Sequence, residues 1–347
     1  MTYKVYQWSS GTVGRAAAQA AVRRDSLELV GLHVQSADKA GRDIGELIGL
    51  DPLGIPATSD IEAIKASNAD VVIHAPLPSL IYGDNPDQDL ADFCELLAAG
   101  KNVITLVGYL YPKVHGPEVV DRLEAACRAG NSSFHSSGLN PGWMGDLLPL
   151  TMSSLCERID HIHVLEISNF EHYPSPEIMF DSMAFGSTPE EFAVKNKRQK
   201  TWLDGLFAES LQLVADGLEM GVTEISSTLE TVLADADIKV AAGVVKAGTV
   251  AGQHWRWAGL ADGQEVVAHE TIWRMHEQVA PDWADGSNRI IFKGSPNMNL
   301  ELPQNFAFMD NGMLATAMHA VNAIPYVVEA GPGIKTFLDL PWIFARK

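Results

Sequence analysis

The sequence predicts an α/β protein with an N-terminal, doubly wound parallel sheet and a C-terminal α+β domain. Three observations support this prediction: short apolar runs alternate with helical patterns over about the first 140 residues, a glycine-containing turn follows the first run, and longer strand-like runs come later. Strands that alternate with helices require right-handed crossovers, and therefore a parallel sheet.

The first domain repeats a strand-helix cycle along the chain. Its apolar runs are short and end in turn residues, while the segments between them have helical spacing and end at glycine or a polar residue. The predicted strands lie at residues 5–8, 27–36, 69–76 and 102–106. The predicted helices lie at residues 14–24, 61–67, 89–99 and 118–130.

The pattern changes after about residue 140, which predicts a second domain around a mainly antiparallel sheet. Strand-like runs occur at residues 158–170, 247–260 and 265–276, and helical tracts at about residues 202–220 and 307–330. The predicted domains are residues 1–140 for dinucleotide binding, 141–305 for substrate binding and dimerisation, and 306–347 as a C-terminal segment.

Composition limits the possible partners. The formal net charge is -19, so the protein is expected to repel nucleic acid and anionic lipid and to bind small molecules. The three cysteines have no CxxC spacing, which fits a reducing compartment. The N-terminus lacks a basic segment followed by a long apolar one, so a cytoplasmic protein is expected.

The stretch WSSGTVGRAAA, residues 8–18, joins the first predicted strand to the first predicted helix. Its S-x-G-x-x-G spacing matches the dinucleotide-binding fingerprint of Rossmann domains, with serine at the first glycine position. Gly11 would let the backbone approach a pyrophosphate, and free amides at the helix start would bind it. The alternative is a tight loop without a ligand. The predicted pyrophosphate-binding residues are Ser9, Gly11, Thr12, Val13, Gly14 and Arg15.

The end of the second predicted strand bears on the choice of coenzyme. Ser36 and Lys39, with Arg42 nearby, suit the 2′-phosphate of NADP(H). Asp38 would instead accept hydrogen bonds from the ribose of NAD(H). NADP(H) is therefore the expected coenzyme, with NAD(H) as the alternative. A third interpretation is a solvated loop whose charged side chains bind neither coenzyme.

Two later strand ends complete the predicted coenzyme site, because ligands in open parallel sheets lie beyond the carboxyl ends of strands. These ends are HAPLPS, residues 74–79, and TLVGYLYP, residues 105–112. Asn140, in GLNPGW, is predicted to join them. The coenzyme-binding residues predicted here are His74, Ala75, Pro76, Thr105, Gly108 and Asn140.

The motifs resemble a known family. The G-x-x-G-R turn, the AP turn and the T-x-x-G-Y turn are similar to those of the coenzyme domain of dihydrodipicolinate reductases. Over nearly the whole chain, the closer resemblance is to the reductase-like branch that contains native amine dehydrogenases and 2,4-diaminopentanoate dehydrogenases. The motifs shared with this branch are SADKAGRDIGEL, GLNPGWMGDLLPL, YPSPEIMFDSMAFG, VAGQHW and ATAMHAVNAIP.

This resemblance implies NAD(P)H-dependent hydride transfer to a C=N or C=O bond, and a last helix that packs back on the Rossmann domain. Two departures limit what it implies. The histidine-rich segment of the lysine-pathway enzyme is VLEISNFEHYPS here, so that biosynthetic role is not expected. The amine dehydrogenases place a glutamate before a YP pair, where this chain has Val107 and Gly108.

Without that glutamate the proton donor stays open. A buried carboxylate, imidazole or phenol beside the nicotinamide can donate a proton. For His135, the alternative is a core histidine that bonds to the backbone. The predicted catalytic candidates are Tyr109, His135, Glu166, Glu171 and His172, with Tyr111 in the same turn as Tyr109. His161 and His163 alternate on a strand, and no metal site is expected.

The resemblance to the amine dehydrogenases implies that Trp143 lines the substrate pocket. The further predicted pocket residues are Leu147, Tyr173 and Met179. Such a lining favours a small, largely apolar carbonyl or amine substrate over a dicarboxylate. Amine dehydrogenase or imine reductase activity is therefore expected; the alternatives are a ketone or alcohol oxidoreductase that does not use ammonia and a non-catalytic dinucleotide-binding sensor.

The second domain is rich in tryptophan. These side chains are expected to line the second sheet or a subunit contact, because aromatic residues dominate cores and interfaces. A homodimer is predicted on this basis. The tryptophans are Trp255, Trp257, Trp273 and Trp283.

Overall fold

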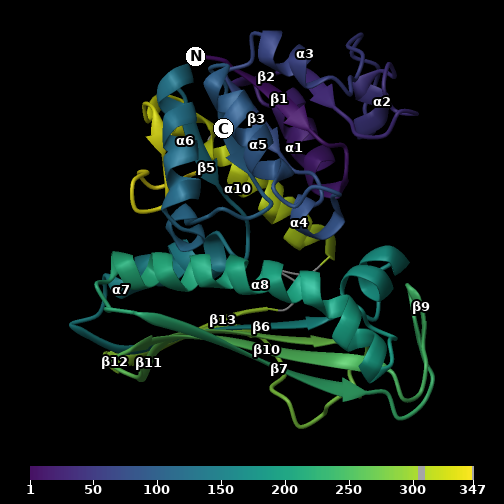
Figure 1. Ribbon diagram of the computed structural model, residues 1–347, viewed down its shortest axis with the longest axis vertical. Helices are drawn as coiled ribbons and strands as arrows, with labels where there is room; N and C mark the ends of the chain where they lie inside the picture. The colour runs from purple at the N-terminus through teal and green to yellow at the C-terminus, as the bar shows by residue number, and fades with distance from the viewer. Residues whose placement is uncertain (304–308, 346–347) are drawn as a thin grey trace. The chain divides into compact units, whose positions relative to one another are not determined.

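The computed structural model describes residues 1–303 and 309–345. The chain divides into two compact units (Figure 1). One consists of Met1–Trp143 together with Asp310–Lys347, and the other of Met144–Met309. Each unit contains its own six-stranded sheet.

The sheet of the first unit is parallel, with the strand order β14-β5-β4-β3-β1-β2. Its strands are short apolar runs, as expected for a sheet that is buried on both faces. Because β1 lies between β2 and β3, the switch point where ligands bind falls between β1 and β3. The predicted doubly wound fold is confirmed. The strands are β1 (Tyr3–Trp8), β2 (Leu27–His33), β3 (Val71–His74), β4 (Asn102–Thr105), β5 (Ser133–Ser136) and β14 (Gly333–Ile334).

Helices cover both faces of this sheet. Residues of α1 (Thr12–Arg23) and α10 (Met309–Glu329) join the hydrophobic core on one face, and residues of α5 (Gln88–Ala98) and α6 (Pro117–Gly130) join the core on the other. The return of the last helix to the Rossmann sheet is therefore confirmed. The shorter helices are α2 (Ile44–Ile48), α3 (Ile61–Ala66), α4 (Ser79–Tyr82) and η1 (Pro112–His115).

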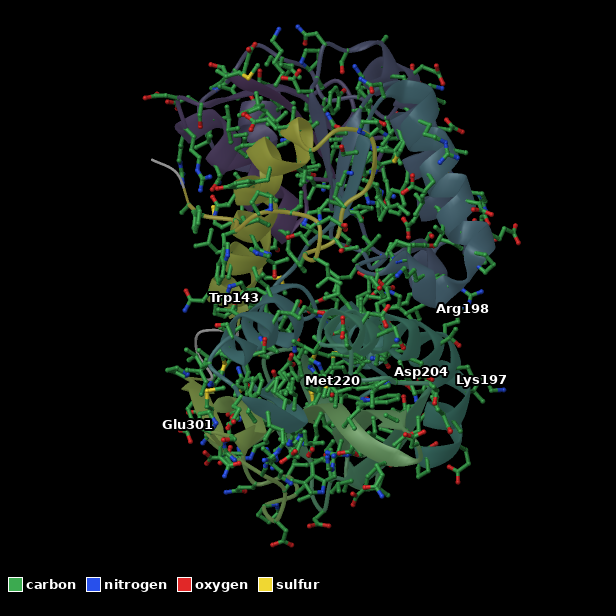
Figure 2. All side chains as sticks on the ribbon, turned by 90° about the vertical axis from the view of Figure 1, so that its left-hand side faces the viewer. Trp143, Lys197, Arg198, Asp204, Met220 and Glu301 are labelled. Carbon is green, nitrogen blue, oxygen red and sulfur yellow. The ribbon has the colours of Figure 1, made fainter. Side chains whose placement is uncertain are left out.

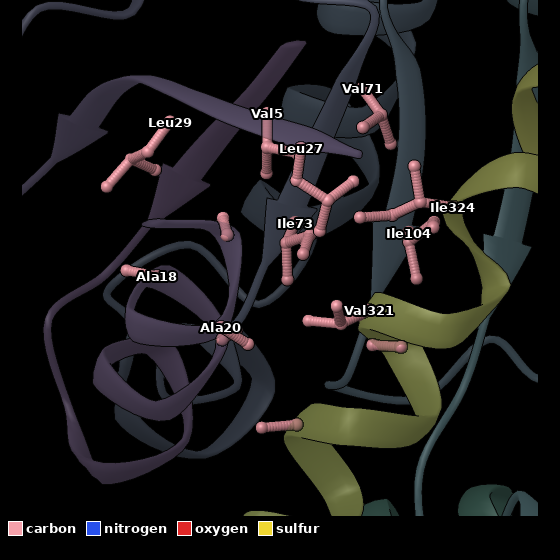
Figure 3. Close-up of a cluster of buried hydrophobic side chains, with 14 of the residues drawn as sticks. Val5, Ala18, Ala20, Leu27, Leu29, Val71, Ile73, Ile104, Val321 and Ile324 are labelled. Carbon is pink, nitrogen blue, oxygen red and sulfur yellow. The ribbon is translucent and has the colours of Figure 1, made fainter. Parts of the chain in front are cut away.

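The core between α1, α10 and the sheet contains small helix residues against β-branched and leucine side chains (Figure 3). Alanines on α1 let the helix approach the sheet closely, and each larger aliphatic side chain buried here stabilises the fold by about 1.5–3 kcal/mol. The labelled residues of this core are Val5, Ala18, Ala20, Leu27, Leu29, Val71, Ile73, Ile104, Val321 and Ile324.

The second unit has a mixed sheet with the order β13-β12-β6-β11-β10-β7. Strands β6 and β11 are parallel, and the other neighbours are antiparallel. A separate hairpin contains β8 (Ile238–Val240) and β9 (Gly243–Val245). The strands of the large sheet are β6 (Arg158–Asn169), β7 (Glu224–Leu233), β10 (Val250–Ala261), β11 (Gln264–Arg274), β12 (Asn288–Ser295) and β13 (Met298–Leu302).

Helix α8 (Pro189–Gly217) lies across one face of this sheet (Figure 1). It begins well before the predicted start near residue 202, because Thr188 and Glu191 form a capping box around Pro189 at the first turn. The remaining helices of this region are η2 (Trp143–Leu147), α7 (Leu148–Ser153) and η3 (Glu177–Ser182). None of the helices within residues 1–303 and 309–345 combines the length and the hydrophobicity of a membrane-spanning segment.

The tryptophans of β10 form the core beneath α8. Trp255 and Trp257 are fully buried and their rings stack on each other. Phe207 of α8 stacks on Trp257 at a centroid distance of 4.1 Å, and the Trp257 Nε1 donates to Asp204 Oδ1 at 2.9 Å. Asp204 lies along α8 (Figure 2). Trp255 and Trp257 thus line the second sheet inside the chain and offer no surface to a partner subunit.

The opposite face of the sheet has a network of imidazoles and carboxylates. His163 and His254 lie 2.9 and 2.8 Å from the Glu270 carboxylate, and Arg256 donates to it at 2.7 Å. Burial raises the pKa of Glu270, but the hydrogen bonds from His163 and His254 outweigh burial and hold this pKa well below its usual range. Arg256 and His161 also bind Glu265. The charged side chains on this face of the sheet are thus paired with one another. No described helix of this unit covers the face (Figure 1).

Candidate functional site

The turn between β1 and α1 has the backbone shape of a dinucleotide-binding loop. Ser9 adopts a φ of 84°, a left-handed conformation that favours glycine. Its amide donates to the carbonyl oxygen of His33 at 2.9 Å, and its hydroxyl accepts from the amide of Gly11 at 3.3 Å. The serine therefore takes the conformation that the first glycine of the fingerprint provides in other Rossmann domains.

The two glycines of the turn have different roles. A Cβ on Gly14 would lie 2.2 Å from the carbonyl oxygen of Ser9, so only glycine allows α1 to pack this closely against the end of β1. A Cβ on Gly11 would meet nothing nearer than the Ser9 hydroxyl at 3.6 Å. Gly14 is thus required by packing, while Gly11 leaves open space in front of the helix.

The start of α1 can hold an anion. The first hydrogen bond of the turn runs from the Arg15 amide to the Gly11 carbonyl at 2.8 Å, and Gly11 provides no side-chain cap. The amides of Thr12, Val13 and Gly14 therefore face the helix entrance, where the helix dipole favours negative charge. Arg15 is exposed beside them. This geometry fits the pyrophosphate of a dinucleotide.

The end of β2 brings a cation to the same loop. Lys39 Nζ lies 3.4 Å from the Ser10 hydroxyl, which connects the turn after β2 to the turn after β1. Ser36 donates a hydrogen bond to the Asp38 carboxylate, and this bond lowers the pKa of Asp38. Both the phosphate-binding lysine and the ribose-binding carboxylate proposed from the sequence are present at this edge.

The His74 ring, at the end of β3, belongs to the core. It is fully buried between Trp8 and Phe93, with ring centroids 5.1 and 4.9 Å away. Its Nδ1 lies 3.1 Å from the Thr105 hydroxyl, and burial lowers its pKa to about 3. A coenzyme contact at His74 would therefore come from its backbone. The following Ala75 and Pro76 are half-buried at the strand end.

The turn after β4 has an unusual backbone. Gly108 and Tyr109 have φ values of 116° and 63°, and Ser136 donates to the Gly108 carbonyl at 2.7 Å. The Tyr109 ring packs edge-on against Phe93 at 5.4 Å, so this candidate contributes to the core beside α5. Tyr109 as a catalytic group stays a prediction.

His135, at the end of β5, is fully buried. Its Nδ1 lies 2.7 Å from the Lys335 carbonyl oxygen, so the protonated nitrogen donates to the backbone. Burial lowers its pKa to about 4, and the ring is neutral at pH 7. These contacts favour the core interpretation, and catalysis by His135 stays a prediction.

The GLNPGW loop follows β5 and is shaped by two glycines. A Cβ on Gly142, whose φ is 130°, would lie 2.4 Å from the Gly138 carbonyl. Asn140 precedes a cis proline in this loop, and the amide of Trp143 donates to the Leu139 carbonyl at 3.0 Å. The backbone of the loop is thus closely packed and sets the position of Trp143 at the start of η2.

The second unit contains the remaining catalytic candidates. Glu166 on β6 is half-buried and accepts a hydrogen bond from the Trp273 indole at 3.0 Å. Glu171 lies 3.9 Å from His276, and His172 is exposed. Glu166 and Glu171 thus contact different partners, Trp273 and His276, and the catalytic roles of all three groups stay predictions.

Two π-helices contain most of the predicted pocket residues. Trp143 and Leu147 lie on η2, and the fully buried Met179 lies on η3. Tyr173 is half-buried and packs edge-on against Phe170 at 6.0 Å. Because single π-turns occur often at functional sites, both segments are candidates for the substrate site. Among the described residues, no group of three or more His, Cys, Asp or Glu side chains is arranged to hold a metal ion.

Two buried carboxylates and one polar contact were not predicted from the sequence. Asp146 on η2 is fully buried and Glu209 on α8 is 1% exposed; an acidic residue inside the apolar run WMGDLLPL was a signal for the first. Lys113 donates to the Tyr111 hydroxyl at 3.0 Å in the turn after β4. No sequence pattern marks this pair, because it depends on the path of the turn.

Comparison with known proteins gives matches over nearly the whole chain. Residues 143–346 match the model of the 2,4-diaminopentanoate dehydrogenase C-terminal domain, and residues 9–84 match that of the dihydrodipicolinate reductase N-terminus. An amine dehydrogenase of Streptomyces virginiae is 31% identical over 96% of this chain and 95% of its own. A 2,4-diaminopentanoate dehydrogenase of Acetoanaerobium sticklandii is 27% identical over 97% of this chain and 93% of its own.

A solved structure has the same fold. The amine dehydrogenase from Mycobacterium smegmatis superposes with a TM-score of 0.80 at 22% identity, covering 100% of this chain and 98% of that one.

Proposed function

This chain belongs to the 2,4-diaminopentanoate dehydrogenase family and is an oxidoreductase, and from this premise we propose that it is an NAD(P)H-dependent amine dehydrogenase. Its substrates would be ammonia and a small, largely apolar ketone or aldehyde, or the imine formed from them. The similarity to an amine dehydrogenase over 96% of the chain is the observation that supports this proposal most directly.

The turn between β1 and α1 supports binding of a nicotinamide coenzyme by the first unit. The amides of Thr12, Val13 and Gly14 would hold the pyrophosphate, and the open space at Gly11 admits it. The nicotinamide would supply the hydride. We propose that this unit binds the coenzyme and that the second unit binds the substrate.

The coenzyme preference is proposed from Lys39. Because its ammonium group lies beside the glycine turn, at 3.4 Å from Ser10, it would pair with a 2′-phosphate.

We expect Lys39→Ala to weaken NADPH binding about 10-fold, since a hydrogen bond to a charged group is worth roughly 1.5–3 kcal/mol. The same variant should change NADH binding less than about twofold. Fluorescence titration with each coenzyme measures both. Lys246→Ala, on the second unit, is the matched control. Equal effects on NADPH and NADH would contradict this assignment and favour Asp38 as the ribose ligand.

A second candidate function is ketone or alcohol oxidoreduction without ammonia. The resemblance implies a glutamate in the turn after β4, where this chain has Val107 and Gly108, and this departure favours the second candidate. A third candidate is a dinucleotide-binding sensor without catalysis.

One experiment separates these candidates. Purified protein is mixed with NADPH or NADH and a panel of small cyclic and aliphatic ketones and aldehydes, with and without excess ammonium, and coenzyme absorbance is followed. We expect oxidation that requires ammonium. Oxidation without ammonium would identify a carbonyl reductase, and coenzyme binding without oxidation would favour the sensor.

The protein is proposed to be a homodimer. The buried tryptophans do not support this, but the face of the second sheet opposite α8 is a candidate for a contact between two copies, because its charged groups are paired and no described helix of this unit covers it. Light scattering at micromolar concentration should give about twice the chain mass of 37.6 kDa. The mass of a single chain would contradict the proposal.

A further inference from the structure

We infer that the first unit has a second ligand site, which binds a small amino acid through both its carboxylate and its ammonium group. The site is a cavity of about 280 Å³ at the amino ends of β1 and β2, where Tyr3 pairs with Leu27. The coenzyme turn follows the carboxyl end of β1, so the cavity lies at the other end of that strand. The inference goes beyond the proposed function and does not depend on it.

The cavity is built by distant segments of one compact unit. Strands β1 and β2, the end of α1 and one side of α10 meet there, and all its described lining residues belong to the first unit. Its main lining residues are Tyr3, Arg24, Leu27, Val321, Asn322 and Glu329.

Arg24 provides a cation whose contacts are with neutral atoms. Its Nη1 donates to Asn322 Oδ1 at 2.7 Å, and its Nη2 donates to the Met318 sulfur at 3.6 Å. The residue is half-buried, and burial lowers its pKa. Within residues 1–303 and 309–345, Arg24 has no carboxylate partner. A guanidinium has five N–H donors and binds a carboxylate through two parallel hydrogen bonds, so Arg24 can bind the carboxylate of a ligand.

The opposite charge comes from α10. Glu329 is the last residue of this helix and accepts a hydrogen bond from the Tyr3 hydroxyl. Pro325, one turn earlier, has no amide hydrogen to donate to the Val321 carbonyl, and both residues line the cavity. This carbonyl points along the helix towards Glu329 and lacks its usual helical donor. The carboxylate, the carbonyl and the C-terminal end of the helix dipole together favour an ammonium group.

The two charges line one small cavity without pairing with each other. Asn322 orients Arg24, and a tyrosine hydroxyl orients Glu329, so each charged group has a neutral partner in the part of the chain that the structure describes. A ligand with a carboxylate and an ammonium group supplies a counter-charge to both. A dicarboxylate would place like charge beside Glu329, and a diamine would do so beside Arg24.

The apolar part of the cavity limits the side chain of the ligand. Leu27 and Val321 are buried and belong to the hydrophobic core between α1, α10 and the sheet. Phe344, which is 58% exposed, adds an aromatic ring to the lining. This lining favours an amino acid with an apolar side chain, such as leucine.

Calorimetric titration of the full-length protein with L-leucine tests the site. We expect a Kd below about 10 mM, which corresponds to about 0.3 kcal/mol for each non-hydrogen atom of the ligand. Leucinamide lacks the carboxylate and 4-methylpentanoate lacks the ammonium group, so each should bind at least about 10-fold more weakly. Absence of L-leucine binding, or equal binding of the three compounds, would overturn the inference.

Two variants locate the binding. Arg24→Met and Glu329→Gln should each weaken L-leucine binding about 10-fold or more, and Arg24→Met should remove the preference for L-leucine over leucinamide. The matched controls are Arg23→Met and Glu28→Gln, exposed neighbours that do not line the cavity; they should change the affinity less than about twofold. Circular dichroism checks the fold, and the analogues test the wild type even where a variant does not fold. Unchanged affinity in both folded variants would place L-leucine elsewhere and contradict the inference.

A competition experiment separates this site from the coenzyme turn. Saturating NADPH should leave the affinity for L-leucine within about twofold, because the two sites lie at opposite ends of β1. Displacement of L-leucine by NADPH would overturn a separate site. The titration needs no turnover, so its result stands whether or not the protein oxidises NADPH with ketones and ammonium.

Discussion

Gly14→Asp is expected to lower the affinity for NADPH by at least about 100-fold, the largest effect on function predicted for this chain. A Cβ at this position would lie 2.2 Å from the Ser9 carbonyl oxygen and 2.9 Å from the Gln7 side-chain nitrogen. The start of α1 would have to move away from β1, which misplaces the amides that bind the pyrophosphate, and the new carboxylate would repel it. Fluorescence titration measures the affinity, and circular dichroism checks that the variant folds.

Two alanine variants separate packing from charge. Gly14→Ala has the same steric overlap without the carboxylate, and should destabilise the free protein by about 1–3 kcal/mol while weakening NADPH binding. Gly11→Ala meets only the Ser9 hydroxyl at 3.6 Å, so it should leave the Tm of the free protein nearly unchanged and weaken binding alone. Normal NADPH affinity in Gly14→Asp or Gly14→Ala would refute the coenzyme role of this turn.

Trp257→Ala is expected to have the largest effect on stability, a loss of about 3–5 kcal/mol in the free energy of unfolding. The indole is fully buried, stacks on Phe207 at 4.1 Å and donates to Asp204 at 2.9 Å. Its removal leaves a cavity beneath α8 and a carboxylate without this donor. Urea unfolding, followed by circular dichroism, measures the change.

Trp342→Ala is the matched control, because Trp342 is 57% exposed and its loss should change stability by no more than about 0.5 kcal/mol. Trp257→Phe keeps part of the stack and should recover part of the stability that Trp257→Ala loses. If Trp257→Ala and Trp342→Ala had the same small effect, the interpretation of Trp257 as the centre of this core would be wrong.

Much of the fold of the first unit could be predicted because its signals are local. The apolar runs that form β1 and β3, and the helical spacing of α5, are properties of a few neighbouring residues. The start of α8 was placed too late, although Thr188 and Glu191 have the spacing of a capping box. That error came from reading the apolar pattern without the cap.

The candidate site was less predictable, because its side chains have partners that are distant in the sequence. His135 looked like a proton donor or a core residue, and its contact with the Lys335 carbonyl depends on β14 pairing with β5. His74 is at the predicted strand end, yet its ring lies between Trp8 and Phe93. Packing against other elements decided each orientation.

Local patterns in the sequence were enough to predict the parallel sheet, the glycine turn and the order of the domains, since hydrophobic period and turn chemistry act between near neighbours. Three features became visible in the folded chain alone: Ser9 adopts a glycine conformation, Trp257 faces α8, and Lys113 contacts Tyr111. Such choices depend on which surfaces the folded chain brings together. A residue type in a linear pattern fixes what a side chain can do, but its partners depend on long-range packing.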